Sequence, residues 1–354
     1  MLSPVLFLLF ASLPGDPSVG GAVARRTTVD TALTRGLTLH RQLVKIATPE
    51  GHYRCALEVE GYALRDILDR VGIKKVDDGF NLPLDTFISV KGRTGASALF
   101  SYSETFLAGD SGPLLASRTR LLLPHHHEPL QANNDPTILR TAAERAALDL
   151  PACASCHAAS AAPALSLPQG WLLISPSDGF GGRFVEDVTE VSDGQTGLIV
   201  KDTRDSTKAA FVDVPKVVAP GGAVSPLTPE RYRAVPQRAW KDAAIGMGMG
   251  FRGEHEWRGA ELGLLLRPLL PASADPRQLW ILVTAEDGYR VLLSGSEVFA
   301  APDGRGVFLA DWRDGKPLGP GSGRYHVVPR PDFFTDCEVR MVKEIRIGQP
   351  GAPR

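Results

Sequence analysis

The 354-residue sequence has no marked excess of charge: 39 Lys and Arg face 40 Asp and Glu, for a formal net charge of −1. Proteins that bind nucleic acid usually carry a strong basic balance, so nothing in the composition supports nucleic acid as a partner. Beyond its first residues the sequence also lacks an apolar run of the ~20 residues that a spanning helix needs. We therefore expect no transmembrane span once any signal peptide has been removed.

Cysteine is scarce, and two of the four cysteines lie in one short string, Cys153-Ala-Ser-Cys156-His157. Cys-x-x-Cys-His is the attachment pattern of a c-type haem. Two thiols at this spacing can reach the two vinyl groups of one porphyrin, and the histidine that follows becomes the proximal iron ligand. The alternatives are a Cys153–Cys156 disulfide, a redox thiol pair, pairing with Cys55 and Cys337, or a bound metal ion.

The distal iron ligand has several candidates. His125, His126 and His127 lie in the same region as the cysteine string, and Met247 and Met249 lie in a glycine-rich segment further along the chain. A methionine ligand would raise the reduction potential relative to a second histidine. The sequence does not choose between them, and a solvated histidine run or loop methionines are equally consistent with it.

The N-terminus has the pattern of an export signal. Val5–Leu13 is a short apolar run without charge, and Ala22-Val-Ala24 fits the small-x-small cleavage pattern, which places the mature start at Arg25. The run lacks the preceding Lys or Arg that usually accompanies it. We predict residues 1–24 to be a signal peptide and the mature protein to be periplasmic or secreted, where haem c is attached and where disulfides also persist.

The remaining chain predicts two diverged copies of one unit. In the second, Asp287-Gly288 joins two apolar strands as a hairpin, and residues 337–347 alternate as a half-buried closing strand. In the first, residues 64–71 have helical spacing with Gly72 as the stop, and Gly61 matches Gly259. We expect a first domain over 25–200, a Pro- and Gly-rich linker over 201–240, and a second domain over 241–348.

The two copies differ by one insertion. The first copy carries an extra stretch, residues 125–170, between its last two strands, and the second copy has no counterpart. Asp135 and Pro136 predict the start of a helix over Thr137–Leu150, and the cysteine string follows it. Insertions of this length often carry the function of a domain, so we place the haem on an insertion in a repeated scaffold.

The repeated pattern resembles the oxidoreductase molybdopterin-binding domain of the sulfite oxidase family. The second copy carries the resemblance best, and the first matches over 64–68 and at Glu104. The motifs of the second copy are Gly259–Leu266, Asp287-Gly-Tyr289, Ser296-Glu297, Asp314-Gly-Lys-Pro-Leu318 and Val342-Lys-Glu-Ile345. The resemblance implies an α+β fold class: two copies of a sulfite-oxidase-like mixed domain with a helical insertion in the first. It also implies molybdopterin as a second cofactor.

One departure from that family bears on activity. Its active members place a molybdenum-ligating cysteine in a Cys-Ala-Gly-Asn-Arg motif, which does not occur here. Cys55 lies nearby and is the only candidate for the ligand, although a cysteine on an alternating strand is more often a small core residue. The basic residues that would hold the pterin phosphate cannot be identified, and a fold alone does not license a function.

Two further patterns have plain interpretations beside their functional ones. His255 and Glu256 could transfer protons, but they fit a polar loop edge better. Gly179–Arg183 could form an anion-binding loop, but a turn before a strand explains it as well.

The sequence thus predicts an exported redox protein with one covalent haem c, serving as a molybdopterin-type oxidoreductase or as the electron-transfer partner of one. Its partner would be a redox protein or a small-molecule donor or acceptor. The competing hypothesis is a cofactor-free binding or scaffold protein.

Overall fold

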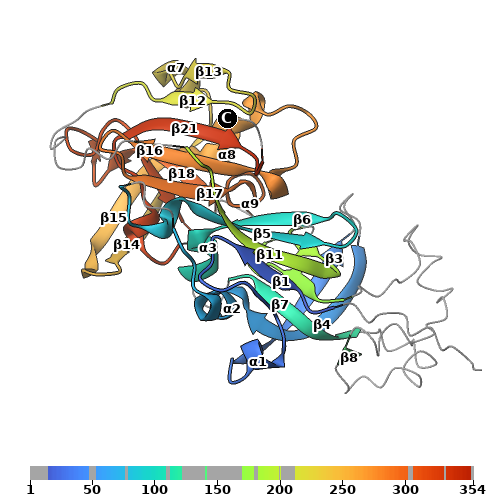
Figure 1. Ribbon diagram of the computed structural model, residues 1–354. Helices are drawn as coiled ribbons and strands as arrows, with labels where there is room; N and C mark the ends of the chain where they lie inside the picture. Colours follow the sequence, from blue (N-terminus) through green and yellow to red (C-terminus); the bar gives the residue numbers. More distant parts are fainter. Residues whose placement is uncertain are drawn as a thin grey trace, which may run out of the picture.

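We describe a computed structural model of the chain over residues 15–47, 53–75, 79–108, 112–121, 140–141, 170–178, 182–198, 200, 212–301, 306–330 and 332–351. This part is mostly β-structure, arranged as four sheets, and its longest helix has eight residues (Figure 1). The expected sulfite-oxidase-like α+β fold is therefore wrong. Of the two helices predicted from the sequence, 64–71 is present as α2, whereas Arg140–Thr141 of the other form a strand, so the described helices are short connections between strands.

The first half of the chain forms two sheets. The first sheet has the order β2-β1-β11-β5-β6, and the second has the order β10-β9-β7-β4-β3 with β8 beside β7. Their strands are β1 Ser18–Gly21, β2 Thr27–Thr28, β3 Leu39–Ala47, β4 Tyr53–Ala63, β5 Thr86–Gly92, β6 Ser97–Ser101, β7 Leu114–Leu121, β8 Arg140–Thr141, β9 Leu172–Ile174, β10 Phe184–Val185 and β11 Val188–Gln195.

The second half repeats this arrangement. Its sheets have the orders β13-β12-β21-β16-β17 and β14-β15-β18-β19, with β20 beside β18. Their strands are β12 Lys216–Val218, β13 Val224–Pro226, β14 Gln237–Gly246, β15 Gly250–Glu261, β16 Trp280–Ala285, β17 Arg290–Ser294, β18 Val307–Arg313, β19 Lys316–Pro317, β20 His326–Pro329 and β21 Val342–Gly348.

The helices are short and lie at equivalent points of the two halves. Each long strand, β4 or β15, leads directly into a helix, and each inner hairpin is followed by another. They are α1 Thr31–Thr34, α2 Leu64–Val71, α3 Tyr102–Phe106, α7 Pro229–Arg233, α8 Leu262–Leu266 and α9 Gly295–Phe299, with 3-10 turns η1 Pro83–Asp85, η4 Arg267–Leu269, η5 Pro276–Gln278 and η6 Thr335–Cys337. The predicted helix ending at Gly72 is confirmed by α2.

Details of pairing show that the halves share one topology. In each, an N-terminal strand runs parallel to the closing strand, β1 with β11 and β12 with β21, while the other neighbours of the closing strand are antiparallel. Gly61 and Gly259 also occupy equivalent positions in the two halves. A Cβ at Gly61 would lie 2.3 Å from the carbonyl oxygen of Leu115, and one at Gly259 would lie 2.4 Å from that of Leu309. Only glycine allows the neighbouring strand to approach so closely.

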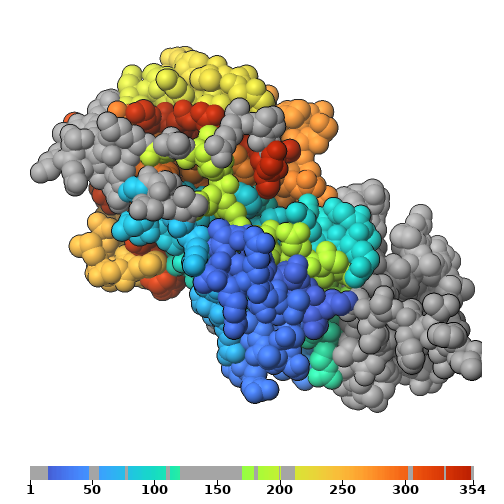
Figure 2. Space-filling model, viewed as in Figure 1, coloured from blue at the N-terminus to red at the C-terminus, as the bar shows by residue number. Residues whose placement is uncertain are grey.

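The two halves pack tightly on each other. In the space-filling view the first half, blue to green, and the second half, yellow to red, meet along a continuous boundary (Figure 2). Phe87 and Leu99 share an apolar cluster with Trp280, Leu282 and Leu292 from the other half. The two sets of strands therefore behave as one folded body with a buried seam.

Three boundaries differ from those predicted from the sequence. Much of the predicted linker, 201–240, is folded: β12, β13, α7 and the start of β14 lie there, and Tyr232 is buried. Its prolines and glycines mark turns between short strands, not a linker. The closing strand begins at Val342 and not at 337, since 335–337 form the turn η6. Within the predicted helix 137–150, Arg140–Thr141 form β8, paired with β7.

The N-terminal boundary also requires a change. Val19 is fully buried in the core, and β1 lies between β2 and β11. Cleavage after Ala24 would remove β1 from the sheet, whereas its counterpart β12 is retained in the second half. Residues from Ser18 onward therefore belong with the folded protein, and a mature start at Arg25 does not fit this arrangement.

Candidate functional site

The haem-attachment residues lie outside the described part of the chain. This applies to Cys153, Cys156 and His157, and also to the candidate ligands His125, His126 and His127. The structure does describe where the insertion leaves and returns. β7 and β9 are hydrogen-bonded neighbours, with Ala116 opposite Leu172. In the second half the equivalent strands β18 and β20 pair in the same way. An insertion at this point can be accommodated without separating strands of the core.

The two methionines suggested as distal ligands lie on the surface. Met247 and Met249 are 57% and 76% exposed, at the tip of the β14–β15 hairpin. That hairpin and β8, the described anchor of the insertion, lie at opposite ends of the molecule (Figure 1). The structure therefore places the hairpin that carries these methionines far from β8.

Two clefts of the described structure bear on a molybdopterin site. The backbone of Cys55 lies in β4 opposite Ile46, and Ile46 lines a cleft of about 330 Å³ that also has Lys45 and Arg183 in its lining. The other cleft, about 240 Å³ with His40, Arg41 and Arg65 in its lining, lies at the other end of β4, beside Ala63. No group of three or more metal-ligating side chains occurs among the described residues.

The remaining sequence candidates have structural roles. His255 forms an exposed contact of 2.7 Å between its Nδ1 and Oδ2 of Asp314, on the surface of the β15 hairpin. Arg183, at the end of the suggested anion loop, is 3% exposed and points inward instead. Its contacts lead to the densest polar cluster of the described chain.

This cluster lies where the two halves meet, and we call it the polar seam. It consists of the buried polar side chains around Arg183, among them Glu104, Asp178, Ser294 and Glu297. Its frame consists of two equivalent helices, α3 and α9, each with a complete capping box. Ser101 accepts a hydrogen bond from the backbone of Glu104, whose carboxylate accepts one from the backbone of Ser101. Ser294 and Glu297 do the same in the second half. The pattern Ser-x-x-Glu at the start of a helix explains both arrangements.

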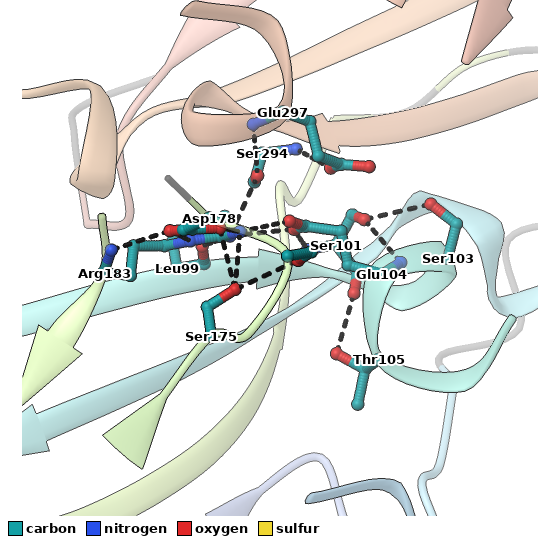
Figure 3. Close-up of polar contacts among 11 residues, drawn as sticks. Leu99, Ser101, Ser103, Glu104, Thr105, Ser175, Asp178, Arg183, Ser294 and Glu297 are labelled. Atoms are coloured by element: carbon teal, nitrogen blue, oxygen red, sulfur yellow. Dashed lines mark hydrogen bonds and ion pairs between the residues drawn. The ribbon is translucent and has the colours of Figure 1, made fainter. Parts of the chain in front are cut away.

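Arg183 occupies the centre of the polar seam (Figure 3). Its Nη1 donates to the carbonyl of Leu99, to Glu104 Oε2 at 2.9 Å and across the seam to Ser294 Oγ at 3.2 Å. Its Nη2 contacts Glu104 Oε1 and Asp178 Oδ1, the latter at 2.6 Å, and its Nε donates to Asp178 Oδ2 at 2.9 Å. With every guanidinium nitrogen engaged, Arg183 has no donor to offer to an anionic substrate.

Charge pairing explains how this arginine is tolerated in the interior. Burial alone would lower the pKa of Arg183, but Glu104 and Asp178 raise it, so it stays charged. Burial alone would raise the pKa of Asp178, but the charge and hydrogen bonds of Arg183 hold it below its usual range. A buried ion pair is stable only when geometry and further hydrogen bonds offset the loss of hydration, and here they do.

The second half has no arginine at the equivalent place. Arg183 lies five residues before the first residue of β11, and Cys337 lies five residues before the first residue of β21. Cys337 is fully buried. Beside it Asp332 and Glu297 carry buried carboxyl oxygens: both oxygens of Asp332 and Oε1 of Glu297 have no hydrogen-bonding partner in the described structure.

Burial favours the neutral form of both carboxyls in the second half. Burial raises the pKa of Glu297 well above its usual value, and the negative charges of Glu104 and Asp332 raise it further. Burial and Glu104 raise the pKa of Asp332 to about 7, although the nearby Cys337 thiol and Ser103 hydroxyl partly offset this. The Cys337 thiol is likewise held neutral, because burial and Asp332 raise its pKa.

Sequence reasoning matched Glu104 with Glu297 as repeated positions but missed the polar seam. The signal that could have indicated it is the pair of Ser-x-x-Glu patterns, 101–104 and 294–297. That pattern places a carboxylate near a helix start. It does not show that both carboxylates face one interior, because this depends on how the halves pack.

Comparison with known proteins adds little. No protein-family model matches the sequence, and no curated protein matches it at a significant level. Among solved structures, the chain has a weak likeness to the sulfane dehydrogenase SoxCD from Paracoccus pantotrophus, at 10% identity and a TM-score of 0.29. The match covers 93% of this chain and 77% of that one. SoxCD is by its name a redox enzyme, but a likeness of this quality decides neither fold nor function.

Proposed function

We propose that the chain is an exported electron-transfer protein that carries one covalent c-type haem. The observation that carries the proposal is the string Cys153-Ala-Ser-Cys156-His157. Its two thiols and one imidazole are the donor set that covalent haem attachment requires, in the required order. A bound haem would supply one-electron redox chemistry.

Each residue of the motif would have its own role in binding the haem. Cys153 and Cys156 would hold the porphyrin through thioether bonds, and His157 would bind the iron from the proximal side. The distal ligand would come from the insertion or from solvent, with His125, His126 and His127 as the protein candidates. The exposed Met247 and Met249 lie in the β14–β15 hairpin, at the end of the molecule opposite β8, and are the less favoured candidates.

The position of the insertion supports the proposal. It joins two strands that pair with each other, so the sheet continues without it, as β18 and β20 show in the second half. Segments attached at such points usually serve function more than folding. A redox group there would stand on a rigid support while staying accessible to a partner protein or to a small-molecule donor or acceptor.

Export is part of the proposal because haem c is attached outside the cytoplasm. The apolar run Val5–Leu13 supports it, and the burial of Val19 moves the expected cleavage site to before Ser18. We propose a periplasmic or secreted location. None of the described helices is long and apolar enough to cross a membrane.

The proposal gives the chain the role of electron carrier, because its motif supplies the donor set of a covalent haem and the Cys-Ala-Gly-Asn-Arg motif of active molybdopterin enzymes does not occur in the sequence. A partner enzyme or a small molecule would supply the electrons.

The test is expression in the periplasm of a host that attaches haem c, followed by a pyridine haemochrome spectrum and the intact mass. We expect one covalent haem per chain, and none in a Cys153→Ala/Cys156→Ala variant. A haem-free protein with a Cys153–Cys156 disulfide would overturn the proposal and favour a cofactor-free binding protein.

A further inference from the structure

The polar seam contains more acid than base. The groups that face it come from several segments of the chain, and Arg183 supplies the positive charge that contacts its carboxyls. The described groups are Ser101 from β6, Ser103 and Glu104 from α3, Ser175, Asp178 and Arg183 from the segment before β10, Ser294 from β17, Glu297 from α9, Asp332 from the segment after β20, and Cys337 from η6. Four carboxyls therefore share a buried site with one guanidinium.

Geometry divides these carboxyls into two pairs. Glu104 and Asp178 contact the guanidinium of Arg183 directly. Oε2 of Glu297 accepts from the backbone of Ser294 at 2.6 Å. Its Oε1 and both oxygens of Asp332 are buried and contact no cation among the described residues, since their polar neighbours are the neutral side chains of Ser101, Ser103 and Cys337. An ionised carboxylate buried in this way, without a counterion, is strongly unfavourable. The second pair is therefore stable only while protonated.

We propose that the contact between the two halves at the polar seam depends on protonation. Glu297 and Asp332 are neutral while the halves are packed, and ionisation of these two side chains loosens the packing. The first half neutralises its capping glutamate with Arg183, and the second half does so with protons taken from solvent. The contact is independent of the haem.

The direction of the pH dependence follows from the unfolded chain. There the two carboxyls titrate near their ordinary values of 3.8 and 4.5, while in the folded protein the pKa of Asp332 is about 7 and that of Glu297 lies well above its usual value. As pH rises above about 4, the unfolded state loses its protons first and gains relative stability. The stability that protonation gives is complete at acid pH and is lost progressively up to about pH 7 and beyond.

Other groups contribute to any such profile, so the experiment needs a matched control. Asp193 is buried in β11, away from the seam, and burial raises its pKa to about 8. The stability that Asp193 contributes is therefore expected to depend on pH with the same sign. The Asp193→Asn variant therefore measures a buried acid that does not lie between the halves.

The test is equilibrium urea unfolding of the full mature protein at pH 5 and pH 8. The variants are Glu297→Gln, Asp332→Asn and their combination. Glutamine preserves the capping bond to the backbone of Ser294, so the Glu297 variant is expected to fold. We expect the unfolding equilibrium constant of the wild type to rise on the order of tenfold or more from these groups between the two pH values. The double variant should lose that rise, and Asp193→Asn should retain it.

A second measurement reports on the seam itself. Peptide mapping after thiol labelling gives the labelling rate at Cys337, corrected for the pH dependence of a free thiol. We expect this corrected rate to rise from pH 5 to pH 8 in the wild type and to stay constant in the double variant. The proposal is overturned if the double variant keeps the full pH dependence of both stability and labelling, or if the wild type becomes more stable as pH rises.

Discussion

The two halves of the molecule accommodate a buried capping glutamate in different ways. Each begins a short helix with a serine and a glutamate in a capping box, and each directs that glutamate into the seam. The first half places Arg183 beside its glutamate, and the second places Cys337 at the equivalent position. Repeated backbones therefore do not imply repeated charges, because the first half pairs its glutamate with a guanidinium, whereas we propose that the glutamate of the second half is neutral.

The largest effect should come from removing the arginine that distinguishes the first half. Arg183→Met leaves Glu104 and Asp178 buried without a counterion, and breaking a buried pair in this way costs about 3–5 kcal/mol of unfolding free energy. Urea unfolding at pH 7 measures this. Cys337→Ala, at the equivalent position of the second half, should cost only roughly 1 kcal/mol, because it removes a small neutral side chain. Equal losses at the two positions would remove the contrast between the halves.

Arg93→Met is the matched control for this arginine. Its ion pair with Asp187 lies on the surface, with the arginine side chain 57% exposed. Exposed pairs contribute less than about 1 kcal/mol, so this variant should unfold close to the wild type.

A second effect should come from the N-terminal strand, which the two halves share as β1 and β12. A mature chain that starts at Arg25 lacks Val19 and its parallel pairing with β11. We expect it to lose about 2–4 kcal/mol, from one buried valine and several backbone hydrogen bonds. Fusion to a foreign signal peptide would produce this chain for urea unfolding.

The natural N-terminus gives an independent check on that strand. Intact mass of the exported protein should place the first residue before Ser18. A native N-terminus at Arg25 with unchanged stability would show that β1 is dispensable.

A third, smaller effect concerns the other buried arginine at the seam. Arg290, from β17, donates to Asp85 Oδ2 at 2.7 Å, but Lys75 lies 2.9 Å from the other oxygen of that carboxylate. Because a cation remains, Arg290→Met should cost about 2–3 kcal/mol, less than Arg183→Met under the same conditions. The reverse order would mean that Asp178 and Glu104 find other partners.

The smallest effect should follow changes at the tip of the β14–β15 hairpin. Met247→Ser and Met249→Ser should each shift the unfolding free energy by less than about 0.5 kcal/mol, because both side chains are exposed. Their reduced visible spectrum should match that of the wild type. A changed spectrum would show that one of these methionines binds the iron after all.

Local patterns predicted those parts of the structure that depend on neighbours in sequence. The helix ending at Gly72 and the hairpin at Asp287-Gly288 are confirmed, since helical spacing and turn chemistry act over a few residues. The folded segment 212–236 was mistaken for a linker, because its strands β12 and β13 are only three residues long and β12 joins the sheet through β21, more than a hundred residues away. Short strands carry little periodicity of their own.

The candidate sites divide in the same way. The haem motif can be recognised from five adjacent residues, whereas the polar seam joins residues from both halves and has no local signature. Arg183 lies at the end of a glycine-rich stretch that suggested an anion-binding loop, and the packing of Leu99 and Glu104 directs it inward instead. Only the arrangement of the four sheets brings these groups together.

The central contrast is that one copy of the scaffold carries an insertion with a haem-attachment motif and the other does not. The most direct test compares the pyridine haemochrome spectrum of the exported wild type with that of a variant in which residues 122–169 are replaced by the second copy's connection, 314–325. We predict one haem per chain in the wild type and a folded, haem-free variant with similar urea unfolding. A wild type without covalent haem would contradict the account.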